Sequence, residues 1–131
     1  KEGLCDISLG NSYYFGAMQE DPAQKEWADA VNFVFPNQAD RGAHMNISGV
    51  VLTKYAPNKT QAQQLIKFMI SEEAQTMYAA VNKEYPVRPG VSLAKDVASW
   101  GQFKEDQSSL SDMSQHQATA MKLVDEVKFD L

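Results

Sequence analysis

The sequence is poor in the residues from which most metal and redox sites are built. Its 131 residues include one cysteine and two histidines. The lone Cys5 excludes an internal disulfide and any metal site made of several cysteines. No run reaches the roughly 18 apolar residues that a membrane-spanning helix needs. The polar start Lys1-Glu2-Gly3 is not a signal peptide, although a chain processed after export fits the same start.

Positive charge is also scarce. Twelve Lys and Arg stand against 17 Asp and Glu, for a formal net charge of −5. Nucleic acids and anionic membranes attract proteins through basic surfaces, so the balance argues against both as partners. Apolar residues at 44% and charged residues at 22% are typical of globular proteins. The length alone would suit one domain with its own core.

Three segments have the pattern of short strands. Residues 4–9 alternate apolar and polar side chains for a few positions, and residues 32–35 (Asn-Phe-Val-Phe) form a short, mostly apolar run before Pro36. Residues 47–54 are the strongest candidate, because their apolar middle is nearly continuous, as in a buried strand.

Several helix starts interrupt these strands. Gly10-Asn11-Ser12 ends the first strand and offers capping side chains, and Asp21-Pro22 is a second start signal. Thr60–Gln63 matches a capping box. Ser71-Glu72-Glu73 predicts a helix that runs to about Asn82, with acidic side chains in its first turn. A last helix is expected near residues 110–127.

The balance of these elements predicts an incomplete fold. Strands interleaved with helices indicate an α/β architecture, in which parallel strands need neighbours on both sides. Three short strands make too small a sheet for so many helices. We therefore predict an incomplete part of a larger α/β protein, with exposed strand edges and a tendency to self-associate.

One cluster suggests chemistry, namely Asn11 with Tyr13 and Tyr14. Near a helix start, adjacent side chains are about 100° apart, so both hydroxyl groups can converge on one point. A phenolate is a hard oxygen donor suited to Fe³⁺, whose charge lowers the pKa of the hydroxyl. The N–H groups of the helix start offer a place for an anion that completes the coordination. The plainer alternative, two tyrosines that only pack, stays open.

The remaining polar residues give no catalytic pattern. His44 and His116 are expected on the surface, and Asn46-Ile47-Ser48 matches only the common glycosylation pattern. No Ser/His/Asp order or glycine-rich phosphate loop is present. We therefore expect a binding protein and not an enzyme.

Longer stretches resemble one known family. Residues 10–15 (Gly-Asn-Ser-Tyr-Tyr-Phe) and residues 45–54 (Met-Asn-Ile-Ser-Gly-Val-Val-Leu-Thr-Lys) resemble the ferric-ion-binding periplasmic proteins of ABC transporters. Residues 71–75, 82–87 and 99–104 are similar to that family in the same order. The resemblance covers nearly the whole chain.

The resemblance implies roles for three residues. Tyr13 and Tyr14 correspond to iron ligands, and Asn11 corresponds to a residue that helps to hold a synergistic anion such as carbonate or phosphate. The other iron ligands lie upstream of this chain in the family, so the Fe³⁺ site is expected to be incomplete here.

The resemblance also implies a fold and a role. The fold is the C-terminal portion of a two-lobed α/β periplasmic-binding-protein fold (type II), with an incomplete sheet. Residues 1–43 and the helical residues 96–131 would belong to the second lobe, and residues 44–95 would return to the first. The expected role is iron transport in the periplasm, with delivery of Fe³⁺ to an inner-membrane ABC permease, and the missing N-terminal portion of the protein is an expected partner.

Two other functions remain open at this point. A solute-binding protein of the same architecture could hold a different ligand, such as an organic cation or an oxyanion, against Tyr13 and Tyr14. A helical interaction domain without a small ligand would instead bury both tyrosines in its core.

Overall fold

The computed structural model describes residues 5–129, which form two compact units. Unit 1 contains the described residues up to Val34 together with Asn46–Gln102. Unit 2 contains Phe35–Met45 together with the described residues from Phe103 onward. Each unit is therefore built from two separate stretches of sequence. This division does not test the expected lobe boundaries at residues 43/44 and 95/96, which stay a prediction.

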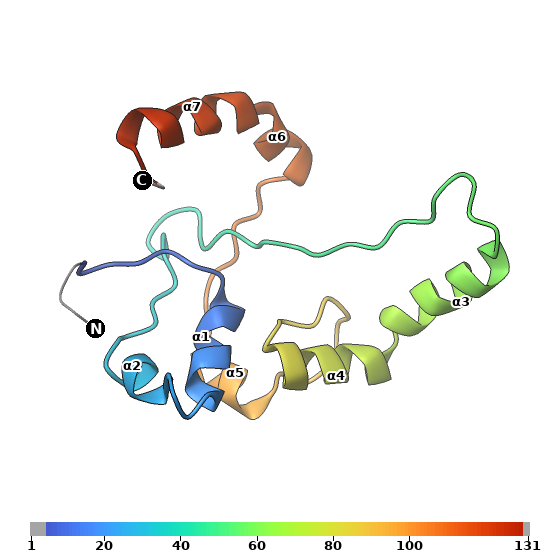
Figure 1. The fold of residues 1–131 in the computed structure, drawn as a ribbon, viewed down its shortest axis with the longest axis horizontal. Coiled ribbons are helices and arrows are strands. Elements are labelled where there is room, and N and C mark those ends of the chain that lie inside the picture. Colours follow the sequence, from blue (N-terminus) through green and yellow to red (C-terminus); the bar gives the residue numbers. More distant parts are fainter. Residues whose placement is uncertain (1–4, 130–131) are drawn as a thin grey trace. The chain divides into compact units, whose positions relative to one another are not determined.

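Unit 1 is helical. Its helices are α1 (Ser12–Glu20), α2 (Lys25–Asp29), α3 (Lys59–Met69), α4 (Glu72–Asn82) and α5 (Lys95–Ser99). Helix α1 contacts α2 and α4, and Figure 1 shows α3 leading directly into α4. Among the described residues, no helix is long and apolar enough to span a membrane.

Helix α4 begins and ends as its sequence predicts. The Ser71 hydroxyl accepts a hydrogen bond from the Ala74 N–H at 3.2 Å, and Glu72 and Glu73 occupy the first turn. The helix ends at Asn82, and Lys83 adopts a left-handed conformation with φ 60°. Capping of the free N–H groups and the acidic first turn both stabilise this start.

An aromatic cluster packs beneath α1. The ring of Phe15 lies 5.2 Å from that of Phe33 and 6.0 Å from that of Trp100, measured between centroids. Tyr85 extends the cluster, at 6.4 Å from Trp100. The Trp100 indole N–H also donates to Gln19 Oε1 at 3.2 Å. Aromatic pairs bury large areas, so this cluster fixes the inner face of the helix that carries the tyrosine pair.

In unit 2, residues 35–45 meet the segment from Phe103 onward through an aromatic pair, a β-bridge and polar contacts that include the ion pair of Arg41 with Asp106. The rings of Phe35 and Phe103 stack with centroids 4.0 Å apart. Ala43 and Glu105 form a parallel β-bridge. The expected last helix occurs as two, α6 (Leu110–Gln115) and α7 (Gln117–Val127).

The three strand predictions are wrong for the described residues. Leu4 lies outside them, and residues 5–9, 32–35 and 47–54 form no strand. Residues 47–52 follow an extended path in Figure 1 but make no backbone hydrogen bond to another described segment. Strand pairing depends on partners from elsewhere in a sheet, and the described chain supplies only the isolated bridge in unit 2. The capping box at Thr60 is also wrong, because the N-cap residue of α3 is Asn58, two residues earlier, and it makes no side-chain cap.

Candidate metal centre

The candidate site lies at the start of α1. Asn11 is the N-cap residue with extended backbone (φ −71°, ψ 144°), and its carbonyl accepts a hydrogen bond from the Tyr14 N–H at 3.1 Å. The Asn11 side chain, however, makes no capping hydrogen bond. The sequence therefore predicts the helix start correctly, while the amide of Asn11 is used for contacts other than capping.

The structure brings Tyr13, Tyr14 and Asn11 together. The two tyrosine rings are 4.5 Å apart between centroids and tilted by 56°. Asn11 Nδ2 donates a hydrogen bond to the Tyr13 hydroxyl oxygen at 3.1 Å. Tyr13 is half-buried, whereas Tyr14 is 57% exposed. Two phenol groups and an amide donor thus lie within one turn of helix, with one phenol open to solvent.

Neighbouring groups raise the pKa of Tyr13 above its usual value. The largest cause is the side-chain hydrogen bond with Tyr14, followed by desolvation, and the negative charge of Glu84 adds to them. The hydrogen bond from Asn11 acts in the opposite direction, because an N–H donor stabilises the phenolate. Without a cation, Tyr13 therefore keeps its proton at neutral pH.

A second asparagine contacts the first. Asn46 Nδ2 donates to Asn11 Oδ1 at 3.1 Å, across 35 positions of sequence. Both residues belong to unit 1, and Asn46 stands at the start of the extended segment described above. This contact joins that segment to the start of α1.

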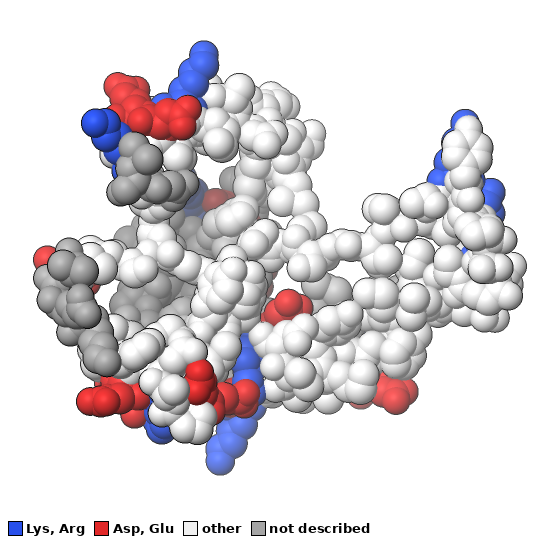
Figure 2. All heavy atoms as spheres, in the orientation of Figure 1, with Lys and Arg blue, Asp and Glu red and all other residues white. Residues whose placement is uncertain are grey.

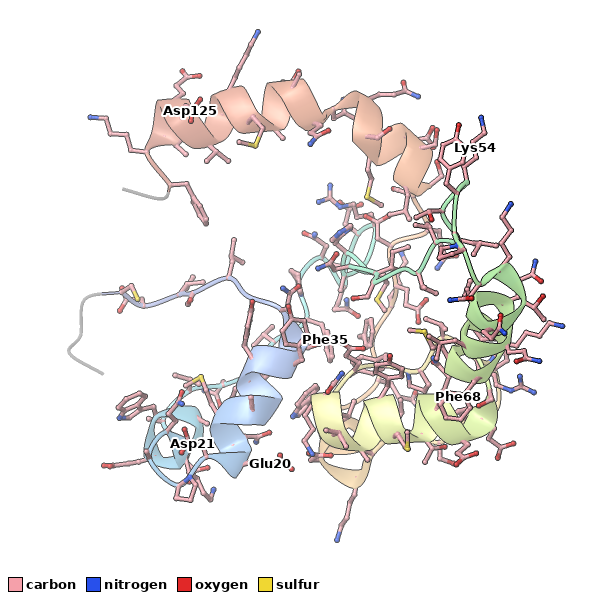
Figure 3. All side chains as sticks on the ribbon, turned by 45° about the vertical axis from the view of Figure 1, so that its right-hand side comes forward. Glu20, Asp21, Phe35, Lys54, Phe68 and Asp125 are labelled. Carbon is pink, nitrogen blue, oxygen red and sulfur yellow. The ribbon has the colours of Figure 1, made fainter. Side chains whose placement is uncertain are left out.

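An open hollow of about 690 Å³ lies beside Tyr13. Its lining comes from α1 and the end of α4, and consists of Tyr13, Ala17, Glu20, Asp21, Val81, Asn82, Lys83 and Glu84. Figure 3 shows Glu20 and Asp21 where α1 ends. The charged residues of the lining are acidic apart from Lys83. On the face drawn in Figure 2, charged side chains form small groups of both signs and no broad basic surface.

The one cation of the hollow is already paired. Lys83 is 5% exposed, and its Nζ lies 2.5 Å from Glu20 Oε1 and 2.8 Å from Asp96 Oδ2. It also donates to the Ala80 carbonyl at 2.7 Å. These partners raise the pKa of Lys83, first through Asp96, while Lys83 lowers the pKa of Asp96. The ammonium group is therefore committed to joining α1, α4 and α5.

The usual nitrogen and sulfur ligands are not gathered in the described part of the chain. No group of three or more His, Cys, Asp or Glu side chains is placed to hold a metal ion there. His44 and His116 are exposed, as their sequence positions predict, and so is Cys5. The phenol oxygens of Tyr13 and Tyr14 are thus the strongest candidate metal ligands.

Sequence reasoning missed three residues of this region. Apart from the family resemblance, Asn46 matched only a glycosylation pattern, and neither Lys83 nor Glu84 carried a local signal beyond following a helix. One indication of the contact between Lys83 and Gly16 was present in the sequence, namely a lysine directly after a predicted helix end and a glycine in the middle of another helix. The hydrogen bond between Asn46 and Asn11 had no such indication, because it depends on the tertiary structure.

Comparisons with known proteins agree on one family. The family model described as bacterial extracellular solute-binding protein matches residues 7–105. Iron uptake protein A1 of Synechocystis is 48% identical over 126 residues, which is 95% of this chain and 35% of that protein. The chain therefore spans about a third of the length of this curated relative.

Solved structures give the same result. Apo ferric ion-binding protein A of Pasteurella haemolytica matches 99% of this chain and 41% of its own, with a TM-score of 0.90 and 49% identity. A Trichodesmium protein in complex with iron and citrate ligands matches 91% of this chain and 38% of its own, with a TM-score of 0.83 and 40% identity.

Proposed function

Because this chain belongs to the bacterial extracellular solute-binding proteins, we propose that Tyr13 and Tyr14 bind a ferric ion as two phenolate ligands. The observation that carries the proposal is the tyrosine pair itself, with rings 4.5 Å apart and an amide N–H on the Tyr13 oxygen. Hard oxygen donors match a hard trivalent cation. The partial exposure of Tyr14 leaves the pair accessible to an incoming ion.

The fold is consistent with this role. The predicted fold class, a portion of an α/β periplasmic-binding-protein fold of type II with an incomplete sheet, is confirmed by the likeness to ferric-binding protein structures. The close relatives are named for iron uptake and ferric ion binding, and none of these names describes an enzyme. The proposed activity is therefore capture and release, not catalysis.

We assign Asn11 to a synergistic anion. Its side chain makes no capping hydrogen bond to the first N–H groups of α1, and free N–H groups at a helix start favour an anion. Carbonate or phosphate would fit this position. The Trichodesmium structure holds citrate with its iron, so a carboxylate is a further candidate for this anion.

Two phenolates and one anion do not complete the coordination sphere of Fe³⁺. We propose that the remaining ligands come from the part of the protein that this chain does not span. In that arrangement the whole protein would capture iron in the periplasm, close its lobes around it and deliver it to an inner-membrane ABC permease. The other lobe and the permease are then its partners, and nucleic acid is not.

The charge-transfer band of phenolate bound to iron tests the proposal. The intact iron-loaded protein should absorb visible light, and the double variant Tyr13→Phe/Tyr14→Phe should lose both the band and the iron. Tyr55→Phe is the matched control, because Tyr55 is 83% exposed and should leave the band unchanged. A colourless loaded wild type, or a band that survives the double variant, would contradict the proposal. Metal analysis of the same samples separates iron from an organic cation or an oxyanion as the ligand.

A further inference from the structure

The amide of Asn11 is oriented by a second residue, Asn46. Asn11 Nδ2 donates to the Tyr13 oxygen at 3.1 Å, while Asn11 Oδ1 accepts from Asn46 Nδ2 at 3.1 Å. The three groups form a short chain of hydrogen bonds that runs from the extended segment at residue 46 to the tyrosine pair. This series of hydrogen bonds has a direction, because each amide has one donating end and one accepting end.

The direction is required once Tyr13 is a phenolate. A phenolate oxygen can only accept, so Asn11 must turn an N–H group toward it, and its carbonyl then faces Asn46. Asn46 must in turn present an N–H. The second N–H of Asn11 Nδ2 makes no further hydrogen bond with the described residues, so it remains available to an anion beside the tyrosines.

We propose that Asn46 is a positioning residue that makes Asn11 a donor toward the iron-bound tyrosine and the anion. By holding the carbonyl of Asn11, it keeps that oxygen from turning toward two negatively charged groups. The inference rests on the proposed function, since it assigns to a residue outside α1 the task of preparing the anion site. Partners of this kind, one bond removed from the ligand, commonly tune a metal site.

Replacements at position 46 test whether Asn46 orients the Asn11 amide or only supports the surrounding structure. Asn46→Ala removes the donor and leaves the Asn11 carbonyl free. Asn46→Asp does more, because a carboxylate only accepts and so draws the Asn11 N–H groups away from Tyr13. Ser48→Asp is the matched control, since it adds the same charge at an exposed position two residues along the same segment.

The experiment uses the intact iron-loaded protein, with inorganic phosphate as the anion probe. We expect phosphate binding to weaken about three- to tenfold in Asn46→Ala, the effect of one lost hydrogen bond, and further in Asn46→Asp. The charge-transfer band should move to longer wavelength in both, because a phenolate without its N–H partner gives up an electron more easily. Ser48→Asp should keep the wild-type band and bind phosphate within about twofold of wild type, because the added charge is screened and exposed.

The result that overturns the inference is an Asn46→Asp variant that behaves like Ser48→Asp. The iron-free protein supplies a second measurement, the NMR signals of the Asn11 side-chain amide, which should shift in Asn46→Ala and stay in place in Ser48→Asp. Unchanged signals contradict the inference whatever the iron result. If Asn46→Ala shifts these signals as expected but the iron-loaded wild type shows no charge-transfer band, the proposed function is contradicted instead.

Discussion

Gly16 in α1 lies directly against the side-chain stem of Lys83. A Cβ atom at position 16 would come within 2.6 Å of Lys83 Cγ and 2.7 Å of Lys83 Cβ, and within 3.2 Å of the Trp100 ring. The lysine can therefore pass across α1 to reach Glu20 only because residue 16 has no side chain. The close approach sets the distance between the helix that carries the tyrosines and the end of α4.

We predict that Gly16→Ala destabilises unit 1. Alanine gains about 1 kcal/mol in a helix interior, but forcing an atom against the Lys83 Cβ and the indole costs about 1–3 kcal/mol or more. The net loss should be roughly 1 kcal/mol in urea unfolding, with a shifted near-ultraviolet signal from Trp100. Gly49→Ala is the control, because an added Cβ there meets nothing within 4 Å. If Gly16→Ala is as stable as wild type or more so, α1 and the end of α4 can move apart at no cost, and the prediction is wrong.

We predict that Lys83→Met lowers the free energy of unfolding by roughly 2 kcal/mol at pH 7, because it leaves Asp96 without its charged partner and the Ala80 carbonyl without a donor. Methionine keeps the stem that packs on Gly16, so the loss reports the ammonium group. Lys95→Met is the control, as Lys95 is an exposed neighbour in α5. Urea unfolding of the three proteins measures the difference.

The ion pair between Lys83 and Asp96 predicts the pH range over which it stabilises the fold. The pKa of Lys83 is raised above 10.5, so its contribution is complete below that value and fades as the pH rises through the raised pKa. The pKa of Asp96 is lowered below 3.8, so its contribution is complete above that value and fades as the pH falls through the lowered pKa. The difference in the free energy of unfolding between wild type and Lys83→Met should therefore be constant between about pH 4 and pH 10 and shrink outside this range. A difference that changes between pH 5 and pH 8 would contradict the assignment.

We predict that iron binding releases protons. The pKa of Tyr13 lies above its usual value, so the hydroxyl is protonated at neutral pH and must lose its proton to become a ligand. Iron affinity of the intact protein should fall as the pH is lowered. Titration in weakly buffered solution counts the protons, and Tyr13→Phe should release about one fewer than wild type if it still binds iron. Proton release that is the same in both proteins would place the ionising group elsewhere.

We predict that the 131-residue chain self-associates through its extended segment. Val51 is 83% exposed and Ile47 is 56% exposed, on a stretch without backbone partners. Such an edge recruits strands from other molecules. Val51→Lys should reduce the mass measured by light scattering, whereas Ser48→Lys, which adds the same charge without removing an apolar side chain, should reduce it less. A monomeric wild-type chain would contradict the prediction.

Local chemistry in the sequence predicts the starts of α1 and α4 and the grouping of Asn11 with Tyr13 and Tyr14. Ser71 caps α4 and Asn11 begins α1 because these effects involve neighbours in sequence. The strand at residues 47–54 fails because its apolar pattern describes a buried strand, and burial needs a sheet that the described residues do not form. The contact of Asn46 with Asn11 was beyond prediction because it joins segments 35 positions apart.

The left-handed backbone of Lys83 has a consequence for which amino acids the position accepts. A residue with φ near 60° is most relaxed as glycine, and asparagine is the next most tolerant. Either replacement would relieve backbone strain in the turn after α4, but it would also remove the ion pairs with Glu20 and Asp96. A randomised library at position 83, selected for folding, should therefore return lysine in place of the residues that its backbone prefers. In that outcome, side-chain charge and not backbone conformation would decide the identity of this residue.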